Sequence, residues 1–481
     1  MQKASLKKNF VMNVILQISG MIFPLISYPY VSRVLGPSGI GTVSFAYSVV
    51  SYFSMLAQLG IPTYGIRACA QVRDNKEELT RTAQELLVIN LVMSAIAYAG
   101  LFLCVAFIPR LHSEPVLYVI MSSFIILTSL GMEWLFQALE QYTYITVRSC
   151  LFKLIAMVAM FVLVRSSSDY LIYGALYIFA TCASNLFNFF YARRYISLRP
   201  VGHYRIKRHL RSVGIFFAMS CATTIYTQMD KTMLGFMTDD AQVGLYNTAA
   251  SIKLVLVSVV TSLGTVLLPR VSYYVARKDT DGFKRVTGKA LNFVLDMAFP
   301  IMVFFLLFAR ESVLALSGEE YTGSILPLQI IVPTVLFIGL SNLFGMEILV
   351  PMGQEKQVLY SEIVGAVVNL VLNALLIPGF GPSGAAVGTL AAEAAVLLYQ
   401  YTVLKDRVSV LLRQISWWKI LVSAVLAGLV SLPVKSLGLG SLLALLLGAV
   451  LYAVIYALLM IVLREPFVRE MLQQLQQKRR G

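Results

Sequence analysis

About fourteen long apolar stretches constrain this chain more than any other feature of its sequence. Each is close to the ~20 residues with which an α-helix crosses a hydrocarbon core about 30 Å thick. Backbone polar groups in lipid must be satisfied within the segment itself, so such stretches are expected to be helices. We place them near residues 10–31, 39–60, 83–107, 116–139, 142–165, 169–192, 212–236, 241–268, 289–309, 325–351, 357–377, 384–404, 416–437 and 439–463. The predicted fold is therefore an all-α polytopic membrane protein.

The composition agrees with this fold and explains the basic net charge. Hydrophobic residues make up 58% of the 481 residues, and charged residues only 13%. With the N-terminus inside, the alternating loops carry 30 Lys and Arg on the cytoplasmic side and five on the other side. This is the positive-inside distribution of a membrane protein with both termini in the cytoplasm. The net charge of +15 thus reports topology and contact with anionic lipids, and nucleic acid is not an expected partner.

The chain is predicted to contain two lobes of six spans followed by a shorter appendage. The boundaries fall at residues 1–198 for the N-terminal lobe and 199–411 for the C-terminal lobe. Residues 412–481 hold spans thirteen and fourteen and a cytoplasmic tail, which we expect to form an amphipathic helix. The basic loop at 193–211 is the predicted hinge between the lobes.

An internal echo supports the two lobes. "LGPSGIGTVSFAYS" (35–48) and "LGFMTDDAQVGLYNTAAS" (234–251) both read Leu-Gly, a polar turn, Gly, and then Ala five residues later. A weaker third version is "GFGPSGAAVGTLAAEAA" (379–395). Inverted or parallel repeats are typical of transporter folds. Prolines inside spans, among them Pro333 in span ten, indicate bent helices, either as packing kinks or as sites of conformational change.

Charged residues deep in the spans are the candidates for chemistry. Lys153 lies in span five, and Lys253 lies near the middle of span eight, where a charge costs at least about 2.5–3.5 kcal/mol. Such residues are expected to face a protein-lined or wet cavity. Glu133 in span four and Glu393 in span twelve are carboxylates at similar depth. Arg33 either lines such a cavity or caps span one at the outer interface.

Span seven carries an Asp-Lys pair near its outer end. Thr223, Thr227 and Asp230 share one helix face, and Lys231 is turned about 100° away. Asp230 and Lys231 are therefore not expected to pair with each other, and they lie either in the cavity or at the outer interface. In span eleven, Asn369 and Asn373 form a polar stripe that either binds helices together or lines the cavity.

Enzyme signatures are not found. The three histidines, His112, His203 and His209, fall in predicted loops without metal-ligand spacing. The sequence has no phosphate-cradling glycine loop with its Lys and no nucleophile elbow. No cofactor or metal is expected, and a transporter is favoured over an enzyme.

Three blocks of the chain resemble bacterial polysaccharide and O-antigen flippases. They are "PYVSRVLGPSGIGTVSFA" (29–46), "EWLFQALEQYTYITVRS" (133–149) and "QMDKTMLGFMTDDAQVGLYNTAASI" (228–252). These flippases belong to the multidrug/oligosaccharidyl-lipid/polysaccharide exporter superfamily, and the likeness extends to span count and hinge position. Ala138 departs from the pattern, because relatives carry Gly there in the second block.

The resemblance implies an inner-membrane transporter that flips undecaprenyl-pyrophosphate-linked sugar units for O-antigen, capsule or exopolysaccharide synthesis. It also implies two lobes around a cationic cavity, alternating access, and antiport driven by H⁺ or Na⁺. Expected partners are the lipid-linked oligosaccharide, membrane lipids and other polysaccharide-assembly membrane proteins. On this basis the anionic headgroup is assigned to Arg33, Lys153, Lys231 and Lys253. Ion coupling or cation pairing is assigned to Asp230, Glu133 and Glu393.

Three alternatives stay open at this point. A lipid II flippase shares the fold and the number of spans. A small-molecule or drug exporter of the same superfamily would have twelve spans, so spans thirteen and fourteen count against it. A membrane polymerase or ligase would present a large outer loop with catalytic Arg or His, and this sequence has none.

Overall fold

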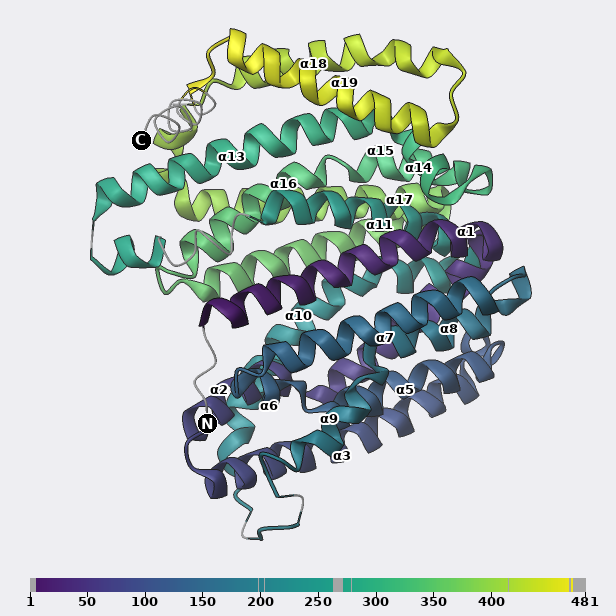
Figure 1. Ribbon diagram of the computed structural model, residues 1–481, viewed down its shortest axis with the longest axis vertical. Helices are drawn as coiled ribbons and strands as arrows, with labels where there is room; N and C mark the ends of the chain where they lie inside the picture. The colour runs from purple at the N-terminus through teal and green to yellow at the C-terminus, as the bar shows by residue number, and fades with distance from the viewer. Residues whose placement is uncertain are drawn as a thin grey trace. The chain divides into compact units, whose positions relative to one another are not determined.

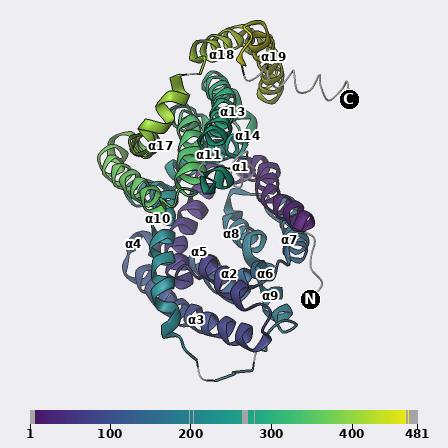
Figure 2. The ribbon, with the colours of Figure 1, turned by 90° about the vertical axis from the view of Figure 1, so that its left-hand side faces the viewer.

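A computed structural model describes residues 6–197, 199–202, 204–262, 271–277, 279–413, 415–466 and 469. All regular secondary structure in these ranges is helical. By their internal contacts the helices form two compact units, Met1–Gly244 and Leu245–Gly481. Figures 1 and 2 show that the long helices within each unit run roughly side by side as a bundle. The predicted lobe boundaries concern pseudo-symmetry, which packing does not test, and they stay predictions.

Helix α1 (Leu6–Gln58) is two membrane spans joined by a reversal. Its 53 residues would extend about 80 Å if straight, far beyond a hydrocarbon core of about 30 Å. Gly36 (φ 66°, ψ 177°) breaks the helix, and Pro37 follows it. In the first arm, the Thr146 hydroxyl donates to the carbonyl of Met12 and the Tyr30 hydroxyl donates to that of Val164, both on or beside α7. The break therefore stands where spans one and two were predicted to join.

The first unit continues through shorter helices whose ends follow local sequence. They are α2 (Ile61–Val72), α3 (Lys76–Phe107), α4 (Pro109–His112), α5 (Pro115–Gly131), α6 (Glu133–Ala138), α7 (Tyr142–Leu163), α8 (Tyr170–Ile178), α9 (Asn185–Ala192) and α10 (Lys207–Met237). Asn75 caps α3 by accepting from the backbone N–H groups of Glu77 and Glu78. Helix α10, predicted as the first helix of the C-terminal lobe, packs with α1 and α2 in this unit.

The second unit repeats the same kind of reversal. It contains most of α11 (Asp240–Thr261), then α13 (Thr280–Leu307), α14 (Ala309–Ser317), α15 (Ile325–Ile331), α16 (Thr334–Asn342), a π-helical segment (Leu343–Leu349), α17 (Glu355–Arg413), α18 (Trp417–Ser431) and α19 (Ser441–Val462). Helix α17 breaks at Gly381 (φ 52°), which is followed by Pro382. Both reversals read Gly-Pro-Ser-Gly, so the echo that looked weaker in sequence uses the same backbone device.

The predicted bend in span ten is confirmed. The helical segments Glu319–Ile331 and Thr334–Leu349 meet at 45°, and Pro333 lies between them. Pro300, in contrast, lies inside the continuous helix α13. A proline bends a helix because it removes one backbone hydrogen bond and its ring clashes with the preceding turn.

Apolar surface confirms that this is a multi-pass membrane protein. On α19 the exposed side chains include Leu442, Leu446, Val450, Val454 and Leu458, a surface that lipid covers well and water does not. Within the described residues, ten helices are long and apolar enough to span a membrane, and eleven if the bent pair counts as one span. The two longest of them each contain a reversal, whereas the more polar α10 is not among them. The count of fourteen stays a prediction, and the predicted amphipathic tail helix lies almost entirely outside the described residues.

The first two copies of the repeated sequence contact each other through one glycine of each copy. A Cβ on Gly41 would overlap the carbonyl oxygen of Asp240, and a Cβ on Gly244 would overlap that of Pro37. Only glycine permits so close a backbone approach. The α1 reversal and the turn between α10 and α11 are thereby held in contact.

We expect Gly41→Ala to destabilise the protein by about 1–3 kcal/mol, since the methyl group must push two backbones apart. Thermal unfolding in detergent would show this as a lower Tm. Gly214→Ala on α10 is the matched control, because open space surrounds that Cβ position. Equal melting temperatures for the two variants would contradict the close packing at Gly41.

Candidate functional site: a polar cavity between α1 and α10

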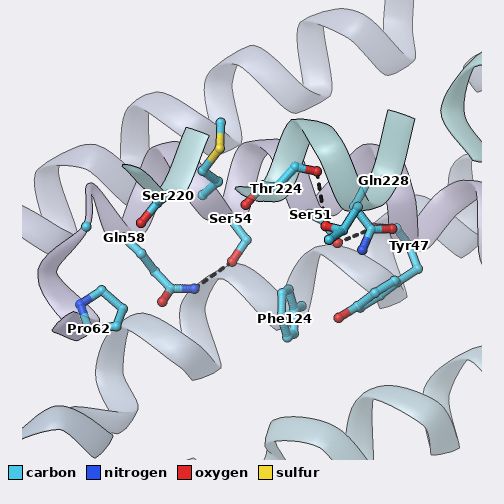
Figure 3. Close-up of a pocket in the computed structure, with 12 residues that line it drawn as sticks. Tyr47, Ser51, Ser54, Gln58, Pro62, Phe124, Ser220, Thr224 and Gln228 are labelled. Carbon is cyan, nitrogen blue, oxygen red and sulfur yellow. Dashed lines mark hydrogen bonds between the residues drawn. The ribbon is translucent and has the colours of Figure 1, made fainter. Parts of the chain in front are cut away.

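The first unit contains a polar cavity of about 240 Å³ between the second arm of α1 and α10 (Figure 3). Spacings of three and four residues place each set of lining side chains on one helix face. The α1 face consists of Tyr47, Ser51, Ser54 and Gln58, and the α10 face of Ser220, Thr224, Thr227 and Gln228. Met55, Gly60, Pro62 and Phe124 complete the wall. None of these lining residues is charged.

Near the turn between α10 and α11, an aromatic pair and an ion pair join α1, α4 and α10. Phe45 of α1 and Phe236 of α10 meet edge to face, with ring centroids 5.1 Å apart. Arg110 of α4 lies over the Phe45 ring and pairs with Asp240 at 2.6 Å. It also donates to the carbonyl of Gly235 at the end of α10. These contacts hold the three helices together at this end of α10.

At the other end of α10, a buried ion cluster joins its first turn to α2 and α3. The carboxylate of Glu85 on α3 is fully buried and contacts His209 Nε2 and Arg208 Nη2, each at 2.7 Å. The other ring nitrogen of His209 hydrogen-bonds the Tyr64 hydroxyl of α2 at 2.8 Å. Beside it, a Cβ on Gly60 would overlap the α10 backbone at Phe216. We call Glu85, His209, Arg208 and Tyr64 the inner cluster.

The predicted hinge loop is fastened to α3 next to the inner cluster. The amide of Gln84 donates to the carbonyls of Ser197 and Arg199 at 2.7 and 2.8 Å. Its oxygen accepts from the Tyr204 hydroxyl at 2.9 Å. Nearby, Arg73 pairs with Glu140 at 2.7 Å, and this hydrogen bond raises the pKa of the Arg73 guanidinium. The described part of the loop is thus anchored, not loose.

Two of the predicted site residues come together in the first unit, outside the cavity. Lys153 Nζ donates to the Ser19 hydroxyl of α1 at 3.1 Å. Glu133 accepts from Gln137 at 3.2 Å and interacts electrostatically with Lys153 and with the buried Arg148. This arrangement is a charge cluster on α6 and α7, next to the first arm of α1.

The outer candidates do not line the cavity. Arg33 is exposed and donates to the carbonyl of Pro29, one turn earlier, at 2.6 Å. Asp230 is buried and Lys231 half-buried, and both take part in further interactions within the protein. Of the predicted threonine stripe, Thr227 lines the cavity, whereas Thr223 is exposed and not among its lining residues.

In the second unit, Glu393 is buried on α17. It lies one turn from Thr389 on α17, and the Thr389 hydroxyl hydrogen-bonds the Tyr246 hydroxyl at 2.9 Å. Asn373 donates to Asn369 at 3.1 Å on the opposite arm of α17, and both pack against Gly388. Lys253 lies half-buried on α11.

Sequence reasoning missed several of these residues. The polar residues from Tyr47 to Gln58 are spaced 4, 3 and 4 apart, and this spacing alone indicates a polar helix face. The placement of His209 in a loop was wrong, because it lies in the first turn of α10 and is 3% exposed. Its carboxylate partner Glu85 is 124 residues away in sequence, so no local pattern indicates the pair.

Comparison with known proteins identifies the family. Residues 6–275 match the family described as "Polysaccharide biosynthesis protein", and residues 216–375 match the MatE family. The first match spans more than half of the chain. This chain belongs to the polysaccharide biosynthesis protein family.

Individual relatives are distant but cover most of the chain. A protein of Escherichia coli (strain K12) named as an O-antigen transporter is 24% identical over 405 residues, which is 82% of this chain and 95% of that protein. A Haloferax volcanii protein named as the low-salt glycan biosynthesis flippase Agl15 is 24% identical over 46% of this chain and 47% of its own length. A solved structure of the lipid II flippase MurJ in an inward closed conformation has a TM-score of 0.72 at 16% identity. It covers 95% of this chain and 100% of its own, and it shows a common fold.

We expect Glu85→Gln to lower the free energy of unfolding of this protein by about 1–3 kcal/mol. The change removes the negative charge that His209 and Arg208 share, at a side chain that is fully buried. Thermal unfolding and the rate of tryptic cleavage within 193–211 would report the loss, with a lower Tm and faster cleavage. Glu77→Gln is the control, since that side chain is 73% exposed; a Glu85→Gln protein as stable and as protease-resistant as this control would refute the role of the inner cluster.

Proposed function

We propose that this protein flips lipid-linked oligosaccharides across the plasma membrane for the synthesis of a cell-surface polysaccharide. The observation that carries the proposal is the polar cavity between α1 and α10. We assign the contacts around Arg110 as its outer closure and the inner cluster as its cytoplasmic closure. Family membership and relatives named as an O-antigen transporter and a glycan flippase support a transporter rather than an enzyme. The substrate is a lipid carrying a pyrophosphate and sugars, with undecaprenol as the proposed lipid.

Alternating access follows from the two closures. The polar headgroup needs a cavity because hydrocarbon cannot solvate it, whereas the lipid tail stays in the bilayer. Opening to the cytoplasm requires that the inner cluster separates while Arg110 and Asp240 stay paired. Opening to the other side requires the reverse. The outer closure combines an aromatic contact with one ion pair, and in the inner cluster Glu85 pairs with both Arg208 and His209. Separation of either closure exposes charges that water can solvate.

The cations assigned from the sequence remain candidates for the pyrophosphate. Lys153, Lys231 and Lys253 are half-buried, so each is shielded from water without being sealed off. A partly desolvated ammonium binds a phosphate oxygen more strongly than one in bulk water. Arg33, which is exposed, suits an outer position where the headgroup leaves.

Glu393 is the favoured site of ion coupling. It is 6% exposed and shares a helix face with Thr389, whose hydroxyl hydrogen-bonds that of Tyr246. A carboxylate with neutral oxygen donors suits Na⁺, and a buried carboxylate also suits a proton. Asp230 and Glu133 are the other candidates, and Glu133 also interacts electrostatically with Arg148 and Lys153.

The location and partners follow from this function. We place both termini in the cytoplasm, with the other polysaccharide-assembly membrane proteins as neighbours in the plasma membrane. A lipid II flippase is the second candidate, because MurJ shares the fold. Relatives named for O-antigen and glycan transport favour the first proposal. The MatE match supports a drug exporter, but it spans only residues 216–375, a shorter segment than the polysaccharide biosynthesis match.

A flipping assay tests the function. The purified full chain, reconstituted in vesicles, is expected to move a fluorescent undecaprenyl-pyrophosphate-linked oligosaccharide between leaflets, and to move lipid II more slowly. Lys253→Ala should lower the initial rate at least tenfold, because a deep cation no longer offsets the pyrophosphate charge. Lys356→Ala, at an exposed lysine, should leave the rate unchanged. Vesicles with wild-type protein that move no lipid-linked sugar would refute the function, and a normal rate for Lys253→Ala would refute that residue's role alone.

Replacement of Glu393 should separate coupling from binding. Glu393→Gln removes a titratable and cation-binding group but keeps the shape of the side chain. We expect the variant to lose the stimulation of flipping by an imposed H⁺ or Na⁺ gradient, while flipping without a gradient continues. Glu355→Gln, at an exposed position at the start of α17, is the control. If Glu393→Gln responds to both gradients as the control does, the coupling site lies elsewhere.

A further inference from the structure

We infer that the cavity between α1 and α10 is a binding subsite for the sugar part of the substrate, and not for its pyrophosphate. The inference rests on the proposed function and assigns one chemical class to one site. Three observations carry it: the neutral charge of the wall, the pattern of its donors and acceptors, and an amide oxygen without a partner.

The wall is polar but contains no charged side chain. Transfer of a pyrophosphate from water into such a site would leave its charge without a counterion, which is costly. A neutral ligand with many hydroxyl groups meets no such penalty. The charged candidates Lys153 and Arg33 are not among the residues lining the cavity, so the anionic group has partners at other positions.

The polar groups of the wall are those that recognise hydroxyl groups. Hydroxyls of serine and threonine and amides of glutamine each act as donor and acceptor, as a sugar hydroxyl does. They face each other from two helices, with Ser54 and Gln58 on α1 opposite Ser220 and Thr224 on α10 (Figure 3). Opposed donor and acceptor rows of this kind can bind a polyhydroxylated ring on both of its edges.

Gln228 of this wall carries a hydrogen-bond acceptor for which the described residues supply no donor. Its side-chain oxygen is buried and, among the residues the structure describes, has no hydrogen-bond partner. A buried acceptor left unpaired costs about 1–3 kcal/mol, so a turn of the Gln228 side chain that lets this oxygen accept from a ligand hydroxyl is favoured. The Gln58 amide is different, since it already donates to the Ser54 hydroxyl at 3.0 Å.

Aromatic rings supply the apolar part of the subsite. Tyr47 and Phe124 line the same cavity and meet edge to face, with centroids 5.5 Å apart (Figure 3). The C–H face of a pyranose ring is apolar and can pack on such a surface while its hydroxyl groups reach the polar rows. The volume of about 240 Å³ is below the range of about 300–1,000 Å³ usual for small-molecule pockets. It therefore suits a small part of the saccharide, not an entire repeat unit.

Binding of two probes by the purified full chain tests the assignment. One probe is undecaprenyl pyrophosphate linked to a disaccharide, and the other is undecaprenyl pyrophosphate without sugar. We expect wild type to bind the sugar-bearing probe more tightly. Thr224→Val and Gln228→Leu should each raise the Kd for that probe about tenfold, because a hydroxyl loses its partner, and leave the Kd for the sugar-free probe unchanged.

Thr223→Val is the matched control on the neighbouring residue, whose side chain is exposed and outside the cavity wall. It should bind both probes as wild type does. Thr224→Val conserves shape and is expected to fold, and Tm values verify this for all variants. Equal weakening for both probes, or no weakening for either, would overturn the sugar assignment. Wild-type flipping of lipid-linked sugar in vesicles would then still stand, so the two failures are distinguishable.

Discussion

The close backbone contact between the α1 reversal and the α10–α11 turn is the constraint on which the cavity of the first unit depends. Gly41 and Gly244 allow carbonyl groups to approach where any Cβ would overlap them. With α1 and α10 joined there, and joined again at Gly60, the middle of each helix can bear the polar side chains that line the cavity. The cavity is thus the space left between two fixed points of contact. The aromatic and ionic closures occupy these same two points.

The two closures differ in how much charge they bury. At the outer end, Arg110 and Asp240 are each partly exposed, so their ion pair adds little stability and can separate into water at small cost. At the inner end, Glu85 is fully buried, and its partners must remain or be replaced by solvent when the helices move. The inner closure is therefore expected to cost more free energy to separate than the outer one. Fastening of the hinge loop at Gln84 strengthens it further, because the loop that leads into α10 is itself hydrogen-bonded to α3.

Periodicity and composition predicted the helical membrane fold, and the turn chemistry of Gly-Pro-Ser-Gly marked both places where a long helix reverses. Those features are local, so a single sequence reveals them. The face of a helix that lines a cavity is different, because it depends on a partner distant in sequence. Thr223 and Thr224 differ by one position and about 100°, and only the packing of α10 on α1 shows that Thr224 lines the cavity. For the same reason the deep charges were visible in the sequence, but their separation from the cavity was not.

That separation gives the proposed transport cycle a physical basis. A single site binding both sugar and pyrophosphate would need cations in the cavity, and these would have to be desolvated whenever the cavity was empty and closed. In a neutral cavity the empty closed state leaves only hydroxyl and amide groups, several of which bond within the protein, as Gln58 does with Ser54. The closed state then costs little without substrate, and the protein can return between cycles. Charge is instead carried at half-buried positions such as Lys153, where a protein hydroxyl already accepts a hydrogen bond from the ammonium group.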